Sequence, residues 1–252
     1  MKSQNKKLSQ TWLGVLAGSL VLVWSHQANA VNTLSHAETL SSNGAITLAD
    51  GTVPTAGGVT VGFFDSTAPL DSVIQSWTAA NAVSNLIASS WVDVRTVTGG
   101  TMQANGDWDW PGGGSPGTAG TKIGGTFNWI FDASKSGKQL YVFAFDGGSS
   151  GFGFSSGSTV AASSFFTSAS FAGSTQWAAL KGANWLFPAT DNTALNLRVA
   201  DIDTAGELIV GTETGANSFR DIGMLAVPEP STGALMMIGA VGLVAMRRLR
   251  KV

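Results

Sequence analysis

Residues 139–145 constrain the fold more strongly than any other part of the chain. Apolar side chains occupy both sets of alternate positions in this segment. One set is Leu140, Val142 and Ala144, and the other is Tyr141, Phe143 and Phe145. Successive side chains of a strand point to opposite faces of its sheet, so a strand that is apolar at every position is buried on both sides. The segment therefore predicts a central strand that is covered on both faces.

The remaining periodicities predict further strands around this one. Alternation of period two, or a short apolar run, marks strands at residues 45–49, 59–64, 126–131, 194–200, 207–210 and 221–226. Residues 91–97 read as another strand, in which Asp93 and Arg95 on one face indicate a solvated side. Residues 132–138 fit a hairpin connection, which would make the strands on either side of them antiparallel neighbours.

Two segments depart from this pattern. Residues 68–89 keep apolar side chains at helical spacing, with Pro69 and Asp71 placed for a first turn, and predict one amphipathic helix. Residues 176–181, which Gly182 follows, fit one or two helical turns. Residues 31–42 are polar and aperiodic, and read as a loose lead-in.

The predicted fold class is mainly β. The chain has 32 Gly and only 12% charged residues, a composition typical of many short strands joined by turns. Cysteine is absent, so stability depends on a hydrophobic core rather than on disulfides. We expect residues 31–226 to form one exported domain, an antiparallel β-sandwich-like body with the helix packed at an edge or end of it.

The N-terminus has the three parts of a signal peptide. Lys2, Lys6 and Lys7 supply positive charge, residues 12–24 are apolar, and Ala28-Asn29-Ala30 is the small-x-small pattern that signal peptidase accepts. Residues 1–30 are therefore predicted to be removed at export.

The C-terminus has the parts of a membrane anchor. Residues 231–246 carry no charge and, as a helix, would extend roughly 24 Å, short of the ~30 Å hydrocarbon core but workable with local thinning of the bilayer. The charges of Arg247, Arg248, Arg250 and Lys251 would stay on the cytoplasmic side, with the body outside the cytoplasm. Pro228 and Pro230 keep Glu229 in an extended stretch before the helix.

Pro228-Glu229-Pro230-Ser231, the apolar run and the terminal Arg cluster together resemble the PEP-CTERM sorting signal of exported bacterial proteins. The resemblance covers residues 227–252 and implies handling by an exosortase and an association with exopolysaccharide or biofilm matrix. A plain C-terminal anchor that no enzyme cuts is the alternative. Gly137-Lys138-Gln139-Leu140-Tyr141-Val142-Phe143 and Trp185-Leu186-Phe187-Pro188 also resemble such proteins, more loosely, and imply no activity.

Charge excludes some partners of the body. Half of the 14 Lys and Arg lie in the two terminal segments, whereas all but one of the 16 Asp and Glu lie in residues 31–226. The body is therefore acidic and has no basic stripe for nucleic acid or anionic lipid.

Candidate sites in the body are weak. His36 is the one histidine after the signal peptide, so a Ser-His-Asp triad is improbable. Asp201 and Asp203 begin a sequence like a calcium loop, but Ala205 and Thr212 occupy positions that should carry ligands. We predict no catalytic residue, no cofactor and no metal.

Residues 99–125 are rich in glycine and contain Asp107, Trp108, Asp109 and Trp110. The two carboxylates are too close in sequence to flank a glycosidic bond from opposite sides. The two tryptophans would share a face of an extended segment and form a flat platform for a sugar, although core packing is the commoner role.

The sequence thus favours a non-enzymatic exported surface or extracellular-matrix protein, sorted through its tail to the cell surface after an inner-membrane intermediate. The alternative is a secreted polysaccharide-active hydrolase or carbohydrate-binding protein with the same tail. No nucleophile, base and orienting group can be assembled from the residues, which is why we place the first reading ahead.

Overall fold

The computed structural model describes residues 31–39, 44–96, 101–102, 121–130, 133–149, 151, 166–190, 193–199, 202, 207–213 and 221–226. In 31–39, 101–102 and 121–130 it describes the backbone only. The chain divides into two units, residues 1–30 and 31–252, and all of the described residues lie in the second.

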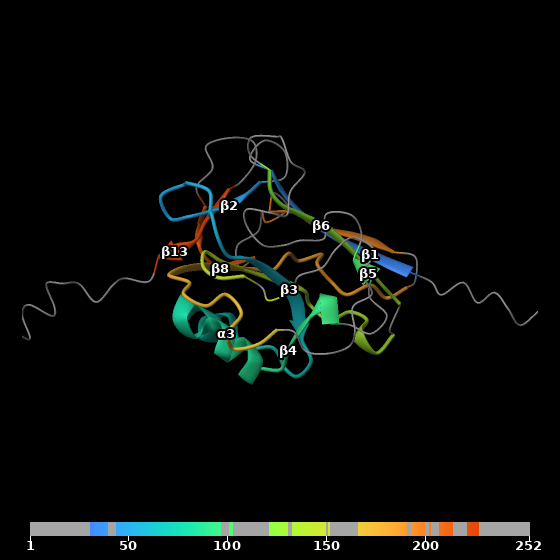
Figure 1. The fold of residues 1–252 in the computed structure, drawn as a ribbon. Coiled ribbons are helices and arrows are strands. Elements are labelled where there is room, and N and C mark those ends of the chain that lie inside the picture. Colours follow the sequence, from blue (N-terminus) through green and yellow to red (C-terminus); the bar gives the residue numbers. More distant parts are fainter. Residues whose placement is uncertain are drawn as a thin grey trace, which may run out of the picture. The chain divides into compact units, whose positions relative to one another are not determined.

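The largest sheet in the described part of the chain has six strands, and we call it the central sheet (Figure 1). Its order is β10 (Leu208–Val210), β8 (Gln176–Leu180), β7 (Tyr141–Phe145), β3 (Gly58–Phe64) and β4 (Trp91–Asp93), while β13 (Leu225–Ala226) also pairs with β8. All of these pairings are antiparallel.

Two smaller sheets complete the described strands. One has the order β5 (Thr101–Met102), β6 (Thr121–Ile130), β1 (Val31–Thr39) and β9 (Ala194–Leu197), and the other has β11 (Thr212–Glu213), β12 (Ile222–Gly223) and β2 (Ile46–Thr47). The pairs β1/β9 and β12/β2 are parallel. The body is therefore mainly β, as predicted, but its described sheets are not purely antiparallel.

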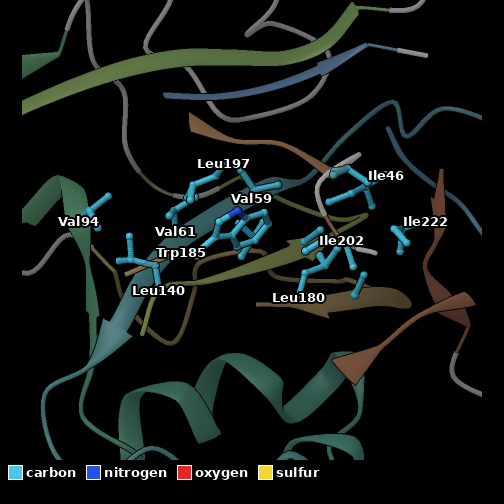
Figure 2. Close-up of a cluster of buried hydrophobic side chains, with 14 of the residues drawn as sticks. Ile46, Val59, Val61, Val94, Leu140, Leu180, Trp185, Leu197, Ile202 and Ile222 are labelled. Atoms are coloured by element: carbon cyan, nitrogen blue, oxygen red, sulfur yellow. The ribbon is translucent and has the colours of Figure 1, made fainter. Parts of the chain in front are cut away.

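Strand β7 lies at the centre of the central sheet and is buried along its whole length, which confirms the prediction from its sequence. Val142 and Ala144 face one hydrophobic cluster, and Tyr141, Phe143 and Phe145 face the other. The first cluster, which we call the aliphatic core, also contains Val59, Val61, Leu180, Trp185, Leu197 and Ile222. Figure 2 shows these side chains converging from several strands and loops.

The second cluster, the aromatic core, is covered by two helices rather than by the single predicted one. They are α2 (Asp71–Gln75) and α3 (Ala79–Ala88), the only α-helices in the described residues. The break falls at Thr78, where a capping box with Asn81 begins α3. Buried side chains of both helices, Ile74, Ala82, Val83 and Leu86, belong to the aromatic core on this face of the sheet, where α2 lies against the edge strand β10 and α3 against the edge strand β4.

Three local predictions also differ from the structure. Residues 176–180 form strand β8, not helical turns, and residues 31–39 form strand β1, not a loose lead-in. The expected hairpin at 132–138 is absent, because β6 pairs with β1 and β5 whereas β7 pairs with β3 and β8. The segment before β7 instead bonds to another loop, with the Leu140 amide donating to the Trp185 carbonyl at 2.7 Å.

Glycine permits two close aromatic contacts in the cores. A Cβ at Gly62 would lie 2.1 Å from the Val92 carbonyl oxygen and 2.7 Å from the Trp91 ring, and a Cβ at Gly182 would lie 2.8 Å from the Trp185 ring. Both tryptophans thus occupy space that any other residue at these positions would fill.

Candidate functional site

Most of the residues predicted to form sites lie outside the described part of the chain. These are the sorting motif Pro228, Glu229, Pro230 and Ser231, the charges Arg247, Arg248, Arg250 and Lys251, the cleavage residues Ala28 and Ala30, the Trp108 and Trp110 platform, and Asp201 and Asp203 of the rejected calcium loop. His36 lies in β1, where only the backbone is described. None of the described helices is long and apolar enough to cross a membrane, and residues 231–246 are not among those described.

The described residues closest in sequence to the sorting motif form β13. Leu225 pairs with Trp177 and Ala226 with Gln176, both on β8. The sorting motif therefore follows an ordered strand of the body with only Val227 between Ala226 and Pro228.

Among the residues that the structure describes, Asp93 and Arg95 form a buried ion pair. The two side chains are 0% and 1% exposed, and the guanidinium donates to both carboxylate oxygens, from Nε at 2.9 Å and from Nη2 at 2.7 Å. Such a bidentate contact is among the stronger hydrogen-bonding arrangements in proteins. Sequence analysis placed both residues on a solvated face, which is wrong.

Neighbouring groups complete the hydrogen bonding of Asp93. The Thr60 hydroxyl on β3 donates to Oδ2 at 2.6 Å, the Arg95 backbone amide donates to Oδ1 at 2.8 Å, and the Trp91 indole donates to the Thr60 hydroxyl at 3.1 Å. We call Thr60, Trp91, Asp93 and Arg95 the buried ion-pair cluster. Its carboxylate accepts hydrogen bonds at both oxygens and is shielded from solvent.

The backbone explains why the two charges meet. Strand β4 ends at Asp93, and residues Val94–Thr96 turn into a 3₁₀-helix that brings the Arg95 side chain back over the carboxylate. Asp93 is buried by alternation, on the same face of β4 as Trp91, whereas the turn after the strand accounts for the burial of Arg95. The sequence pattern that could have predicted this ion pair is two opposite charges, two residues apart, at the end of an apolar run.

A second ionic group lies at the surface. Lys135 and Lys138 each place Nζ 2.9 Å from Oδ1 of Asp65, and both ammonium groups also lie over the Phe63 ring, at 5.8 and 5.3 Å from its centroid. Hydrogen bonds from Lys138, and then from Lys135, lower the pKa of Asp65 from 3.8 to about 2. Asp65 is therefore ionised at neutral pH and holds the segment before β7 against the end of β3.

Other described carboxylates bind backbone amides or a lysine. Asp146 accepts from the amides of Thr175 and Gln176, Glu207 from that of Ala183, and Asp221 from that of Ala45, at 2.6–2.9 Å. Asp71 pairs with Lys181 at 2.6 Å. Within the described residues, no three His, Asp or Glu side chains are grouped so that they could hold a metal ion.

Comparison with protein families places a PEP-CTERM protein-sorting motif at residues 226–251. The match agrees with the interpretation of the C-terminal sequence, and it marks the chain as an exported protein that is sorted through its C-terminus. Neither a curated protein nor a solved structure matches the chain.

Proposed function

We propose that this PEP-CTERM protein is a non-enzymatic component of the cell surface or extracellular matrix, associated with exopolysaccharide or biofilm. The observation that carries the proposal is the match of residues 226–251 to the PEP-CTERM family model. In this account signal peptidase removes residues 1–30, an exosortase acts on the tail, and the sandwich-like body of residues 31–226 is what the cell displays or releases.

The contacts of the carboxylates that the structure describes favour a structural role. A glycosidase needs two carboxyl groups that face each other across the bond to be cleaved. Asp65, Asp71 and Asp93 are instead held by basic side chains, and Asp146, Glu207 and Asp221 by backbone amides. These contacts stabilise turns and strand ends, which supports the proposal over the alternative of a polysaccharide hydrolase.

A glycan-binding screen of the purified body, residues 31–226, tests the proposed function. We expect retention on at least one class of acidic or neutral exopolysaccharide, and no release of reducing sugar from it. Release of reducing ends at a rate above that of a heat-unfolded sample would instead establish the hydrolase.

The account also assigns roles to the parts of the tail. Residues 231–246 would cross the inner membrane, and the terminal basic residues would keep the end of the chain in the cytoplasm. The body then lies outside the cytoplasm while the exosortase acts, and afterwards at the cell surface or in the matrix.

Removal of the terminal charge should loosen retention in the membrane. If Arg247, Arg248, Arg250 and Lys251 are changed together to Ser or Gln, no positive charge resists translocation of the end of the chain. We expect a larger full-length fraction outside the inner membrane, measured by fractionation and blotting. A matched control changes Lys2, Lys6 and Lys7 instead, which should slow export rather than release the chain; equal retention of the tail variant and the natural protein would contradict the assigned role.

A further inference from the structure

Strand β13 joins the sorting motif to the body, and the body does not hold it as it holds the preceding residues. Ile222 and Met224 are 0% and 1% exposed in the aliphatic core. Their amides donate to the carbonyls of Ala45 and Thr47, each at 2.8 Å. By contrast, both residues of β13 are exposed, and Leu225 shows 44% of its surface to solvent.

This contrast places the last firmly held residue of the body at Met224. Beyond it, Leu225 and Ala226 are attached to β8 by strand pairing and bury little apolar surface. Segments with few buried apolar contacts open locally, without unfolding of the rest of the protein.

Release of β13 would leave the central sheet intact. Strand β8 pairs along its other side with β7, and β10 pairs with its distal end, at Leu180 and Ala179. Only the half of the β8 edge at Gln176 and Trp177 loses a partner when β13 leaves.

The pairing of β13 with β8 competes with any enzyme that binds the main chain immediately before Pro228. Enzymes and receptors that bind an extended peptide use its main-chain N–H and C=O groups, together with pockets for alternate side chains. In the folded body the main chain of β13 already pairs with β8, and only Val227 lies between it and Pro228. Release of Leu225 and Ala226 gives three free residues before Pro228, a reach of about 10 Å.

We infer that β13 is a detachable strand that must leave β8 before a sorting enzyme engages the Pro-Glu-Pro motif. The inference rests on the proposed function in that the motif is read by an enzyme. It adds that the folded body controls access to the motif through a two-residue strand.

Hydrogen exchange of the purified full chain tests whether β13 detaches. The amides of Leu225 and Ala226 should exchange at least about a hundredfold faster than those of Ile222 and Met224, because they open without global unfolding. Exchange of Leu225 and Ala226 at the rate of Met224 would overturn the inference, whatever the fate of the tail.

An engineered disulfide tests whether detachment is required. Ala226→Cys with Gln176→Cys joins two residues that are direct cross-strand partners, at a separation that a disulfide can span. The natural chain has no cysteine, so no other pairing competes. In the oxidising compartment outside the cytoplasm, the double variant should shorten its tail at least about tenfold more slowly than either single variant. Addition of a reductant should restore the rate.

The single variants are matched controls. Gln176→Cys alone removes the hydrogen bond that the Gln176 side chain accepts from the Ala49 amide. Comparison of the double variant with this single variant therefore separates the effect of the disulfide from the loss of that hydrogen bond. Equal shortening of the bonded double variant and the single variants would overturn the inference while leaving the proposed function intact. If the natural chain is not shortened at all, the proposed function fails, and the exchange rates of Leu225 and Ala226 still decide whether β13 detaches.

Discussion

Asp93→Ala should lower the free energy of unfolding by about 3–5 kcal/mol, because it removes the carboxylate whose two oxygens accept hydrogen bonds from the buried Arg95 guanidinium. The side chains of the pair are at most 1% exposed, so water cannot replace the lost carboxylate. The variant also removes the acceptor of the Thr60 hydroxyl. Domains are typically stable by only 5–15 kcal/mol, and the loss is therefore a large fraction of the total.

Denaturant unfolding of purified variants measures this effect. Asp50→Ala is the matched control, since Asp50 is exposed and accepts hydrogen bonds only from neighbouring Thr52; it should cost less than about 1 kcal/mol. The double variant Asp93→Leu with Arg95→Met should recover much of the loss, because it leaves no uncompensated charge. A cost below about 1 kcal/mol for Asp93→Ala alone would show that the pair is not buried as described.

Phe143→Ala should cost about 3–5 kcal/mol, the usual range for deletion of a large aromatic side chain from a core. Phe143 is 0% exposed and lies at the centre of the aromatic core. Its ring meets that of Trp91 edge-on at 5.1 Å and stacks with that of Trp177 at 6.4 Å. The rings of Tyr141 and Trp77 also stack with the ring of Phe143.

The control for Phe143 is Val73→Ala on α2, whose side chain is 45% exposed. It should change the free energy of unfolding by less than about 1 kcal/mol. Thermal and denaturant unfolding, followed by tryptophan fluorescence, measure both variants. Natural stability in Phe143→Ala would show that the strand at the centre of the fold had been wrongly identified.

The sequence predicted correctly those features that depend on the burial of one segment alone. Full apolarity of residues 140–145 predicted a strand covered on both faces, and alternation at Val59, Val61 and Phe63 predicted a face that lies in the aliphatic core. Tyr141, Phe143 and Phe145 were expected to be covered in this strand and are buried in the aromatic core.

The predictions from sequence that failed concern which segments lie next to one another in the fold. Alternation shows that residues 126–131 and 139–145 are strands, but it does not show that β6 and β7 belong to different sheets. Residues 176–180 carry apolar side chains that suit a helix or a strand equally, and pairing with β7 decides the outcome. Asp93 and Arg95 alternate like a solvated face, yet Asp93 shares the buried face of β4 with Trp91, and the 3₁₀-helix after the strand turns Arg95 into the interior.

The function of the C-terminal tail can be predicted from its sequence more directly than that of any other segment. A short motif followed by an apolar run and basic residues can be identified from one continuous stretch of sequence. That is why residues 226–251 could be interpreted without knowledge of the fold.

We propose that Pro228, Glu229 and Pro230 are recognised by a sorting enzyme and are not only the start of a membrane anchor. Changing all three to Ala leaves the apolar run untouched and favours helix, so insertion into the membrane should persist. Blots of membrane and medium fractions distinguish the outcomes. We expect the variant to remain at full length in the inner membrane, whereas the natural protein is shortened and outside it; a variant that is shortened and released just as the natural protein is would contradict the account.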